Sequence, residues 1–239
     1  MNVAEEYAGT RHGTGLFRDT QLELAGPCAR YLAQLITRDT FDEPIAVRAE
    51  VAGAESEEGS LVQILDSHVR RHRRAIQKAL RVTLGRALER CYLTSPYFVP
   101  PARLMRALIH AARRDVDVRV LTAGRSDVPL VRLASQHLYG RLLRAGVRIF
   151  ELENRVLHAK TVTIDGVYAS VGSFNLDYWS DRRNLEVSVT VLDRGAAGAL
   201  EEQFKKDLGG AREVKLESWT QRTLARRIMG WLAYQVLKI

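Results

Sequence analysis

From Leu61 onward, short apolar runs alternate with longer stretches whose apolar residues recur every three or four positions. The runs are typical of buried strands, and the longer spacing is typical of helices that pack on a sheet. The first such stretch places Ile76, Leu80, Leu84 and Leu88 on one helical face. The predicted strands are 61–65, 91–94, 116–122 and 147–150, and the predicted helices are the stretch around 76–88, then 102–114 and 128–145.

The alternation changes after residue 150. Three strand-like runs, 156–165, 168–171 and 185–192, follow one another without a helix between them, and two helices, 196–208 and about 219–238, complete the pattern. Strands separated by helices pair in parallel, whereas consecutive strands pair antiparallel. We therefore predict an α/β fold with a mixed β-sheet that is flanked by helices on both faces.

The first sixty residues have a different pattern. Residues 20–24 alternate polar and apolar side chains, which predicts a strand, and residues 29–36 after Pro27 predict a helix. Residues 52–60 are small, acidic and rich in Ser and Gly, which is typical of a linker. We predict three parts at this stage: a first segment at 1–51, a linker at 52–60 and a larger domain at 61–239.

Composition narrows the class of protein. The chain has 239 residues, 46% of them hydrophobic and 27% charged, as in an ordinary globular protein. We expect no membrane-spanning segment and no secretory signal, because no apolar run is long enough and the first residues lack a basic segment before an apolar one. Two cysteines, Cys28 and Cys91, fit a reducing compartment and exclude a disulfide framework or a cysteine zinc site. A formal charge of +8 favours anionic partners, although a solvated basic surface explains it equally well.

The candidate chemistry begins at His158 and Lys160. On an extended chain, side chains two residues apart point to the same face, so this imidazole and this ammonium lie together. Such a pair suits a phosphate, because the imidazole can attack phosphorus or pass a proton while the ammonium neutralises oxygen charge. Asp165-Gly166 follows as a turn.

Three further polar groups come soon after this pair. Ser173 and Asn175 can donate hydrogen bonds to phosphoryl oxygens, and Glu186 can accept one from an imidazole and so fix its tautomer. A lone His-x-Lys pair is usually a solvated strand edge, but a long composite pattern rarely arises by chance. The composite here is His158-x-Lys160-x4-Asp165-x6-Gly172-Ser173-x-Asn175, followed by Asn184-x-Glu186.

At these positions the sequence resembles the phospholipase D superfamily, and most closely its bacterial cardiolipin synthase branch. The resemblance covers about residues 61–220 and includes Ser95–Pro100, Gly124–Asp127, Leu157–Asp165 and Asn175–Tyr178. It implies a phospholipase D-like fold and a phosphatidyltransferase that moves a phosphodiester through a phosphohistidine to water or another alcohol. It also implies that neither a metal nor another cofactor is needed.

The resemblance assigns roles to the matching residues. His158 would attack phosphorus or protonate the leaving alcohol, and Lys160 and Asn175 would hold the phosphoryl oxygens. Ser173 would support the pocket, and Glu186 would orient the imidazole of His158. The order of the two histidine roles stays open at this stage.

A complete site of this family uses two such motifs, and this chain carries one. No second His-x-Lys occurs in the first sixty residues, yet residues 1–20 resemble the stretch that follows the missing motif, with Asn2 and Asp19 as remnants of its half-site. The resemblance makes Asp165 structural rather than chemical. Three explanations compete: a truncated copy or wrong start, which we favour, a single-motif protein that pairs two copies of His158, and a non-catalytic remnant.

The last predicted helix mixes four cations with Trp, Leu, Ile and Val, as does a helix that lies in a bilayer interface. Packing on its own domain explains it equally well. The expected substrate is an anionic phospholipid like phosphatidylglycerol, and the expected location is cytoplasmic and peripheral to the cell membrane. The basic run 68–74 could meet headgroups or nucleic acid, with nucleic acid less favoured. Two alternative functions remain: a homodimeric phosphodiesterase or nuclease, and a non-catalytic binder of anionic lipid.

Overall fold

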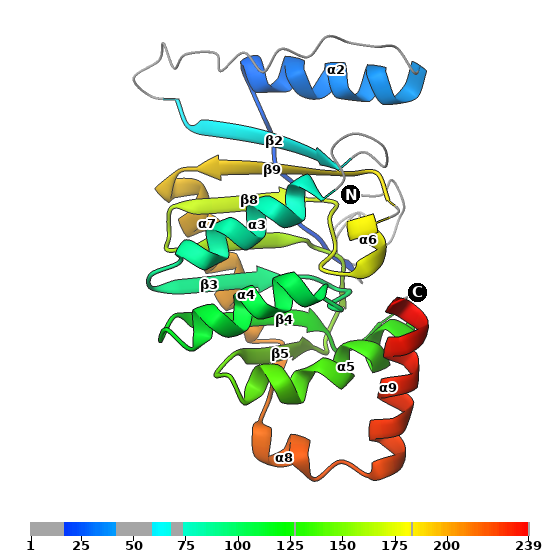
Figure 1. The fold of residues 1–239 in the computed structure, drawn as a ribbon. Helices are drawn as coiled ribbons and strands as arrows, with labels where there is room; N and C mark the ends of the chain where they lie inside the picture. Colours follow the sequence, from blue (N-terminus) through cyan, green and yellow to red (C-terminus); the bar gives the residue numbers. More distant parts are fainter. Residues whose placement is uncertain (1–16, 42–58, 68–73, 127, 183, 239) are drawn as a thin grey trace.

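The computed structural model describes residues 17–41, 59–67, 74–126, 128–182 and 184–238. Their centre is a mixed eight-stranded sheet with the strand order β10-β5-β4-β3-β7-β8-β9-β2 (Figure 1). Only β3, β4 and β5 run parallel to one another, and every other pair is antiparallel. The strands are β2 (Leu61–Ser67), β3 (Arg90–Thr94), β4 (Asp117–Ala123), β5 (Arg148–Leu152), β7 (Thr161–Ile164), β8 (Tyr168–Gly172), β9 (Glu186–Leu192) and β10 (Ala211–Val214).

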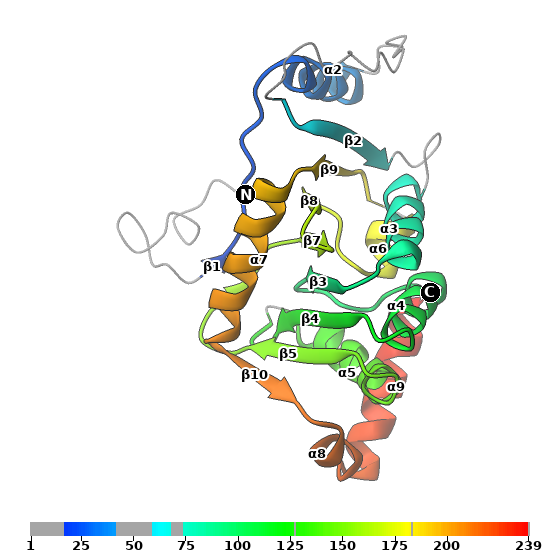
Figure 2. The ribbon, with the colours of Figure 1, turned by 90° about the vertical axis from the view of Figure 1, so that its left-hand side faces the viewer.

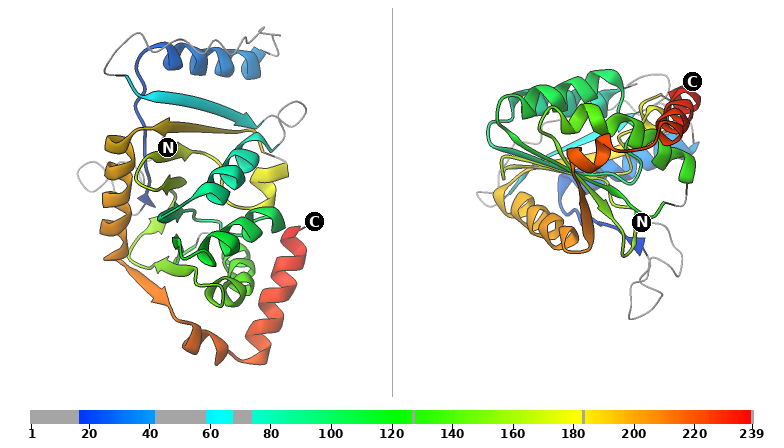
Figure 3. Two further views of the ribbon diagram at one scale, coloured as in Figure 1. Left: turned by 60° about the vertical axis from the view of Figure 1, so that its left-hand side comes forward. Right: turned by 90° about the horizontal axis from the view of Figure 1, so that it is seen from below.

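Helices cover both faces of this sheet. Helices α3 (Ala75–Arg86), α4 (Ala102–Ala112) and α5 (Pro129–Leu143) lie on one face, and α7 (Arg194–Leu208) lies on the other (Figures 2 and 3). Helix α2 (Pro27–Phe41) lies beyond the β2 edge. The chain ends in α8 (Leu216–Thr220) and α9 (Leu224–Lys238), and α9 packs on α5. The predicted fold class is confirmed.

Alternation along the central strand explains the two-layered core. Leu93 belongs to the apolar cluster between the sheet and α3–α5, whereas its neighbour Tyr92 belongs to the cluster beneath α7. The Tyr92 ring stacks on Phe204 of α7, with ring centroids 5.0 Å apart. Because successive strand side chains point to opposite faces, one buried strand serves both layers. This packing fixes the sheet whose edge carries the site described below.

The turn between β7 and β8 fastens one end of the sheet. Asp165 and Gly166 both have positive φ, 53° and 64°, as a two-residue hairpin turn requires. The Asp165 carboxylate accepts hydrogen bonds from the backbone N–H groups of Leu88, Glu89 and Arg90 at 2.8–3.0 Å. Partial burial raises the pKa of Asp165, but these hydrogen bonds and the Arg90 charge outweigh it and hold the pKa below its ordinary value.

Two predicted strands differ from the structure. The strand expected at 20–24 is wrong, because the regular element is β1 (Phe17–Arg18), which pairs in parallel with a two-residue partner, β6 (Val156–Leu157), and ends with it. The strand expected at 156–165 is interrupted at residues 158–160. The Arg18 carbonyl there accepts from the N–H groups of both His158 and Ala159, so the chain leaves β6 before it joins the sheet as β7.

The C-terminal helix is also interrupted. Residues 219–238 were predicted as one helix, but α8 ends at Thr220 and α9 begins at Leu224. The Thr223 hydroxyl accepts from the N–H of Arg226, which starts a new helix. Two short elements were not predicted, β10 and α6 (Tyr178–Arg182), because neither is long enough to show a periodic pattern.

The predicted division of the chain is described only in part. The linker predicted at 52–60 lies outside the described residues except for Gly59 and Ser60, and so do most of 1–51 and of the basic run 68–74. Within the first segment, β1 pairs with β6 of the larger domain and so joins its structure. Among the described residues, no helix is both long and apolar enough to cross a membrane.

The hydrogen bonds of Asp165 generate a stability prediction. Asp165→Asn should lower the free energy of unfolding by about 1 kcal/mol at neutral pH, because a charged acceptor for three N–H groups is lost. Since the folded pKa of Asp165 is lowered, the difference should be full above the ordinary value near 3.8 and should vanish as the pH falls through the folded pKa. Urea unfolding between pH 3 and 7 measures it. Asp115→Asn, at an exposed site, is the matched control and should change little.

Candidate active site

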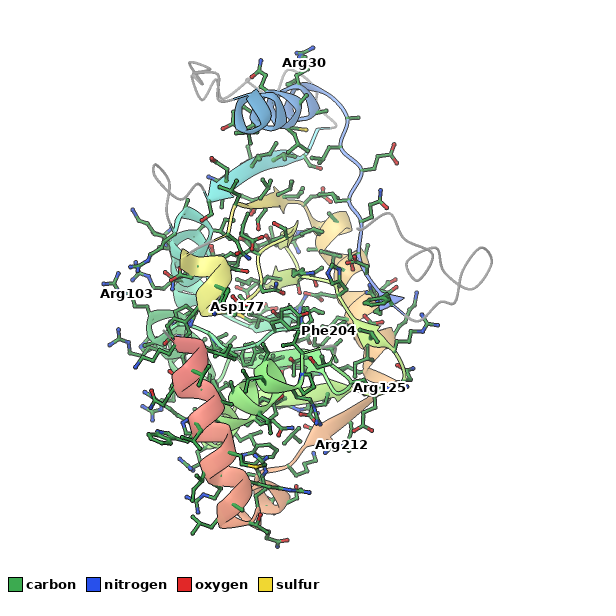
Figure 4. All side chains as sticks on the ribbon, turned by 90° about the vertical axis from the view of Figure 1, so that its right-hand side faces the viewer. Arg30, Arg103, Arg125, Asp177, Phe204 and Arg212 are labelled. Carbon is green, nitrogen blue, oxygen red and sulfur yellow. The ribbon has the colours of Figure 1, made fainter. Side chains whose placement is uncertain are left out.

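The polar residues singled out above gather at one edge of the sheet. Strand pairing places Thr94 beside Thr161, Ala123 beside Leu152, and Ser67 beside Glu186. The carboxyl ends of β2, β3, β4 and β5 therefore meet the starts of β7 and β9, and we call this the reactive edge. Figure 4 looks onto it. Open α/β sheets commonly bind ligands at this edge of their parallel strands.

His158 is held at the reactive edge by Asp19. The Nδ1 atom of the imidazole lies 2.9 Å from Oδ2 of Asp19, a residue 139 positions away in the sequence. The side chain of His158 is 27% exposed and that of Asp19 is 12% exposed. The Phe17 ring meets the imidazole edge to face, with centroids 6.3 Å apart. The ring is thus oriented from one side while part of it still reaches solvent.

Asp19 is charged at every physiological pH. Burial raises the pKa of its carboxyl, but the hydrogen bonds from His158 and from the Thr20 backbone, with the positive charges of His158 and Lys160, outweigh it and lower the pKa. A carboxylate on Nδ1 favours the tautomer in which Nδ1 carries the proton and Nε2 is the reacting nitrogen. This geometry serves both a nucleophile and a proton carrier.

Arg18 fixes the backbone that carries Asp19. Its guanidinium forms an ion pair with Asp207 of α7, with 2.8 Å between Nη2 and Oδ2, and both side chains are nearly buried. It also donates to the Asp19 carbonyl and to the Thr20 hydroxyl. The Arg18 carbonyl in turn accepts from the backbone N–H of His158 at 2.8 Å. One residue thereby positions both members of the Asp19–His158 pair.

Lys160 lies beside His158, as the two-residue spacing predicts. Its Nζ donates to the His158 carbonyl at 2.5 Å, and Ala159 between them is fully buried. The backbone of Lys160 is tied to the next strand, because its carbonyl accepts from the N–H of Gly172 at 3.2 Å. The regular strand is interrupted here, yet the alternation of the three side chains survives.

Ser173 and Glu186 form the next part of the edge. A Cβ on Gly172 would stand 2.4 Å from the Val187 carbonyl oxygen, so only glycine permits this approach of β8 and β9. The Ser173 hydroxyl donates to Oε2 of Glu186, and the Asn184 amide donates to Oε1 at 3.1 Å. Glu186 is buried, and both of its oxygens are engaged.

The predicted role of Glu186 needs a correction. It was expected to orient the imidazole of His158, but its described partners are Ser173 and Asn184, and the carboxylate on Nδ1 is that of Asp19. The physical reason is the β1–β6 pairing, which brings a carboxylate from the start of the chain to this ring. Sequence distance concealed that contact.

Asn175 presents its amide at the same edge. Its side-chain Oδ1 is buried and has no hydrogen-bond partner among the described residues. The loop around it is held by Ser95, whose Oγ accepts from the N–H of Leu176, and by Asp177, which caps α6 through the N–H of Ser180. Burial above all raises the pKa of Asp177 to about 6. An amide without a protein partner on a fixed loop suits a phosphoryl oxygen.

Two of the candidate residues do not join this group. Asp165 lies at the opposite edge of the sheet, five extended residues or about 16 Å from Lys160, where it binds backbone N–H groups. Its inclusion among the candidate catalytic residues is therefore wrong, while its structural role is confirmed. Asn2 lies outside the described residues, as does Asp127 of the predicted loop.

Sequence reasoning missed Arg18, Asp207 and Asn184 as positioning residues. Arg18 and Asp19 are neighbours, so the signal for Arg18 was present in the stretch 17–20. Asp207 sits at the end of an ordinary amphipathic helix, and no local pattern distinguishes it from a solvated acid. Asn184 was seen only as the first residue of Asn-x-Glu, and its bond to Glu186 depends on a bend that the spacing does not specify.

The fold and the site define a phospholipase D-like domain, and the comparisons with known proteins agree. A family model described as "Cardiolipin synthase, PLD-like domain" matches residues 80–208, more than half of the chain. The chain therefore belongs to the cardiolipin synthase family of phospholipase D-like domains.

Among curated relatives, Cardiolipin synthase A of Pseudomonas fluorescens is 33% identical over 224 residues, which cover 92% of this chain and 46% of that protein. Cardiolipin synthase A of Pseudomonas aeruginosa is 35% identical over 217 residues, which cover 90% and 44%. Cardiolipin synthase 2 of Bacillus anthracis is 31% identical over 234 residues, which cover 96% and 46%. The chain spans less than half the length of these relatives.

Solved structures share the fold. The phospholipase D family member Nuc from Salmonella typhimurium superposes with a TM-score of 0.57 at 20% identity, over 66% of this chain and 99% of that chain. Phosphatidylserine synthase from Haemophilus influenzae superposes with a TM-score of 0.61 at 12% identity, over 74% of this chain and 47% of that chain. The family fold thus occurs both as a complete short chain and as part of a longer one.

The Arg18–Asp207 ion pair generates a second prediction. Asp207→Ala should lower the free energy of unfolding by about 3 kcal/mol, because it leaves a nearly buried guanidinium without its carboxylate. The double variant Arg18→Ala/Asp207→Ala should lose less than the sum of the two single variants, as measured by urea unfolding in a double-mutant cycle. Additive losses would contradict the pairing.

Proposed function

We propose that this chain supplies one histidine half-site of a phosphatidyltransferase of the cardiolipin synthase type. The observation that carries the proposal is the Asp19–His158 pair, with Lys160 beside it at the reactive edge. A carboxylate, an imidazole and an ammonium in this order suit the transfer of a phosphodiester. Family membership and the names of the curated relatives support the same chemistry.

The proposed reaction has two steps. In the first, Nε2 of His158 attacks phosphorus, a P–N bond forms, and the P–O bond to the leaving alcohol breaks. In the second, the oxygen of an acceptor alcohol or water attacks the same phosphorus, gives up its proton, and releases the histidine. The Asp19 carboxylate stabilises the positive charge on the ring, and Lys160 and Asn175 stabilise the oxygens of the transition state. Run in the opposite role, His158 protonates the leaving alcohol.

We propose that a second histidine completes the site. A leaving alkoxide needs a proton, and general acid catalysis typically contributes about a hundredfold to ten-thousandfold to such a step. Asp19, which precedes β2 and the main sheet, orients the His158 imidazole from a distant part of the chain. Glu186, held by Ser173 and Asn184, offers an equivalent carboxylate at the same edge. The second imidazole would come from another segment of a longer protein or from another copy.

For the substrate we propose an anionic phospholipid such as phosphatidylglycerol, with the hydroxyl of a second lipid or water as acceptor. The names of the relatives and the formal charge of +8 support an anionic lipid. A lipid substrate requires contact with a bilayer, so we also propose that the protein works while peripherally bound to the cell membrane.

A homodimeric phosphodiesterase is the second candidate. The observation that favours it is that a complete short chain, Nuc, superposes over 99% of its length on this fold. Two copies related by a two-fold axis would bring two His158 imidazoles to one phosphate. Activity that depends on protein concentration through a monomer–dimer equilibrium would favour this candidate over a composite single chain.

The proposed function predicts a covalent intermediate on His158. A diester with a nitrophenolate leaving group needs no acid, so the chain should release nitrophenolate and carry an acid-labile phosphoryl group even where the second histidine is absent. His158→Ala should lower this rate at least about a hundredfold and abolish the label. Quenched-flow release and mass spectrometry of peptides measure both effects.

The matched control is His110→Ala on α4, where the histidine is exposed and lies outside the reactive edge. It should leave the rate and the label unchanged. A label that persists in His158→Ala would overturn the proposal. Labelled phosphatidylglycerol and DNA, offered in parallel to the wild-type chain, then separate phosphatidyl transfer from nuclease activity.

A further inference from the structure

Helix α9 has two apolar faces, and the domain uses only one. Gly230 and Ala233 are buried against α5, where a Cβ on Gly230 would stand 3.2 Å from the Leu133 carbonyl oxygen. The other face carries a row at four-residue spacing together with two large neighbours, and all of these side chains are between 47% and 68% exposed. We call this row the outer stripe; it consists of Leu224, Ile228, Met229, Trp231, Leu232 and Val236.

The outer stripe is more than scattered surface hydrophobicity. Six large apolar side chains lie together on one short helix, and none of them is buried by another described element. A contiguous apolar patch of this kind usually marks a contact surface, since leaving it in water is unfavourable. The partner must therefore offer an apolar surface.

The borders of the stripe show the charge of that partner. A cavity of about 590 Å³ lies between α5, α8 and α9, and its cations are Arg141, Arg144, Arg222, Arg226 and Arg227. Within the described residues, the guanidinium groups other than that of Arg222 form no ion pair or hydrogen bond with another side chain. Many other arginines of the domain are paired with carboxylates, as Arg18, Arg90 and Arg212 are. The cluster therefore carries uncompensated positive charge.

Part of this cluster is rigid before any ligand arrives. Arg222 lies over the Trp219 ring, 4.0 Å from its centroid, and donates to the Gln136 side chain at 3.0 Å. Gln136 in turn donates to the fully buried carboxylate of Glu151 at 3.1 Å. Burial and the neighbouring charge of Arg226 both lower the pKa of Arg222, which reflects the crowding of like charges. Anchoring lowers the entropy lost when an anion binds.

The stripe and the cavity lie on the side of the molecule that carries the reactive edge. Helix α9 stands at that side in Figures 1 and 4. The hydroxyl of Tyr234 on α9 lies 3.3 Å from that of Tyr178, which follows Asn175 by three residues. A surface that contacts α9 from outside is therefore next to the loop that presents Asn175.

From these observations we infer that α9, with the arginine cavity at its base, is a docking surface for an anionic bilayer. The outer stripe enters the headgroup and acyl boundary, and the arginines bind lipid phosphates around it. The inference rests on the proposed function, because it places the lipid next to the reactive edge. It adds the surface that holds the domain there, which phosphoryl chemistry alone does not require.

Co-sedimentation of the full chain with vesicles tests this inference. The chain should bind phosphatidylglycerol vesicles and bind phosphatidylcholine vesicles much more weakly. Arg226→Glu/Arg227→Glu should lower the partition coefficient at least about thirtyfold, since each cation near an anionic surface contributes about a factor of five. Trp231→Ala/Leu232→Ala should lower it about tenfold, because apolar insertion is lost.

The matched charge control is Lys205→Glu/Lys206→Glu, an adjacent exposed pair on α7, which should bind nearly as the wild type does. His158→Ala should bind unchanged, so a failure of the proposed chemistry and a failure of docking are distinguishable. Circular dichroism checks that each variant is folded.

Three results would overturn the inference. The first is an arginine variant that binds phosphatidylglycerol vesicles as tightly as the wild type. The second is release of bound protein by inorganic phosphate but not by NaCl of equal ionic strength, which would assign the cavity to a free anion. The third is an outer-stripe variant that changes the oligomeric state while vesicle binding stays constant, which would assign the stripe to a protein contact.

Discussion

The hydrogen bond between Asp19 and His158 is the constraint on which the site depends. It joins residues 139 positions apart and sets the ring of the one imidazole that the phosphate-binding motif contains. The two-residue pairing of β1 with β6 and the Arg18–Asp207 ion pair both serve to hold Asp19 in place. Lys160 and the Gly172–Ser173 corner are then tied to the same backbone through the strand ladder. If Asp19 were displaced, the other groups would remain while the imidazole lost its defined tautomer.

The two ends of the central sheet have different tasks. At one end, Asp165 binds three backbone N–H groups, and the hairpin closes on it, so this end is stabilised by hydrogen bonds within the protein. At the other end, Asn175 keeps an amide oxygen without a described partner, and Ser173 and Glu186 engage each other at an exposed corner. A motif that reads as one unit in sequence is thus divided between a structural end and a reactive end, because a strand of β7's length separates Lys160 from Asp165.

Much of the fold was predictable, because buried strands and amphipathic helices from Leu61 to Leu208 have strong periodicity, and the composite motif placed His158, Lys160, Ser173 and Asn175 correctly. Short elements were not: β1, β6, β10 and α6 have two to five residues, too few to show a period. The partner of the imidazole was assigned to Glu186 because it lies nearby in sequence, whereas tertiary pairing delivers Asp19. Local patterns predict which residues share a strand face, but not which distant carboxylate meets them.

The most direct test of this account is the protonation pattern of the His158 ring, observed by nitrogen-15 NMR of the side chain in the wild type and in Asp19→Asn. The account predicts that the neutral wild-type ring carries its proton on Nδ1, bonded to a carboxylate, and that the variant shows a mixture of tautomers. In Glu186→Gln the ring should keep the wild-type pattern. An unchanged ring in Asp19→Asn, with a changed one in Glu186→Gln, would contradict the account and restore Glu186 as the orienting acid.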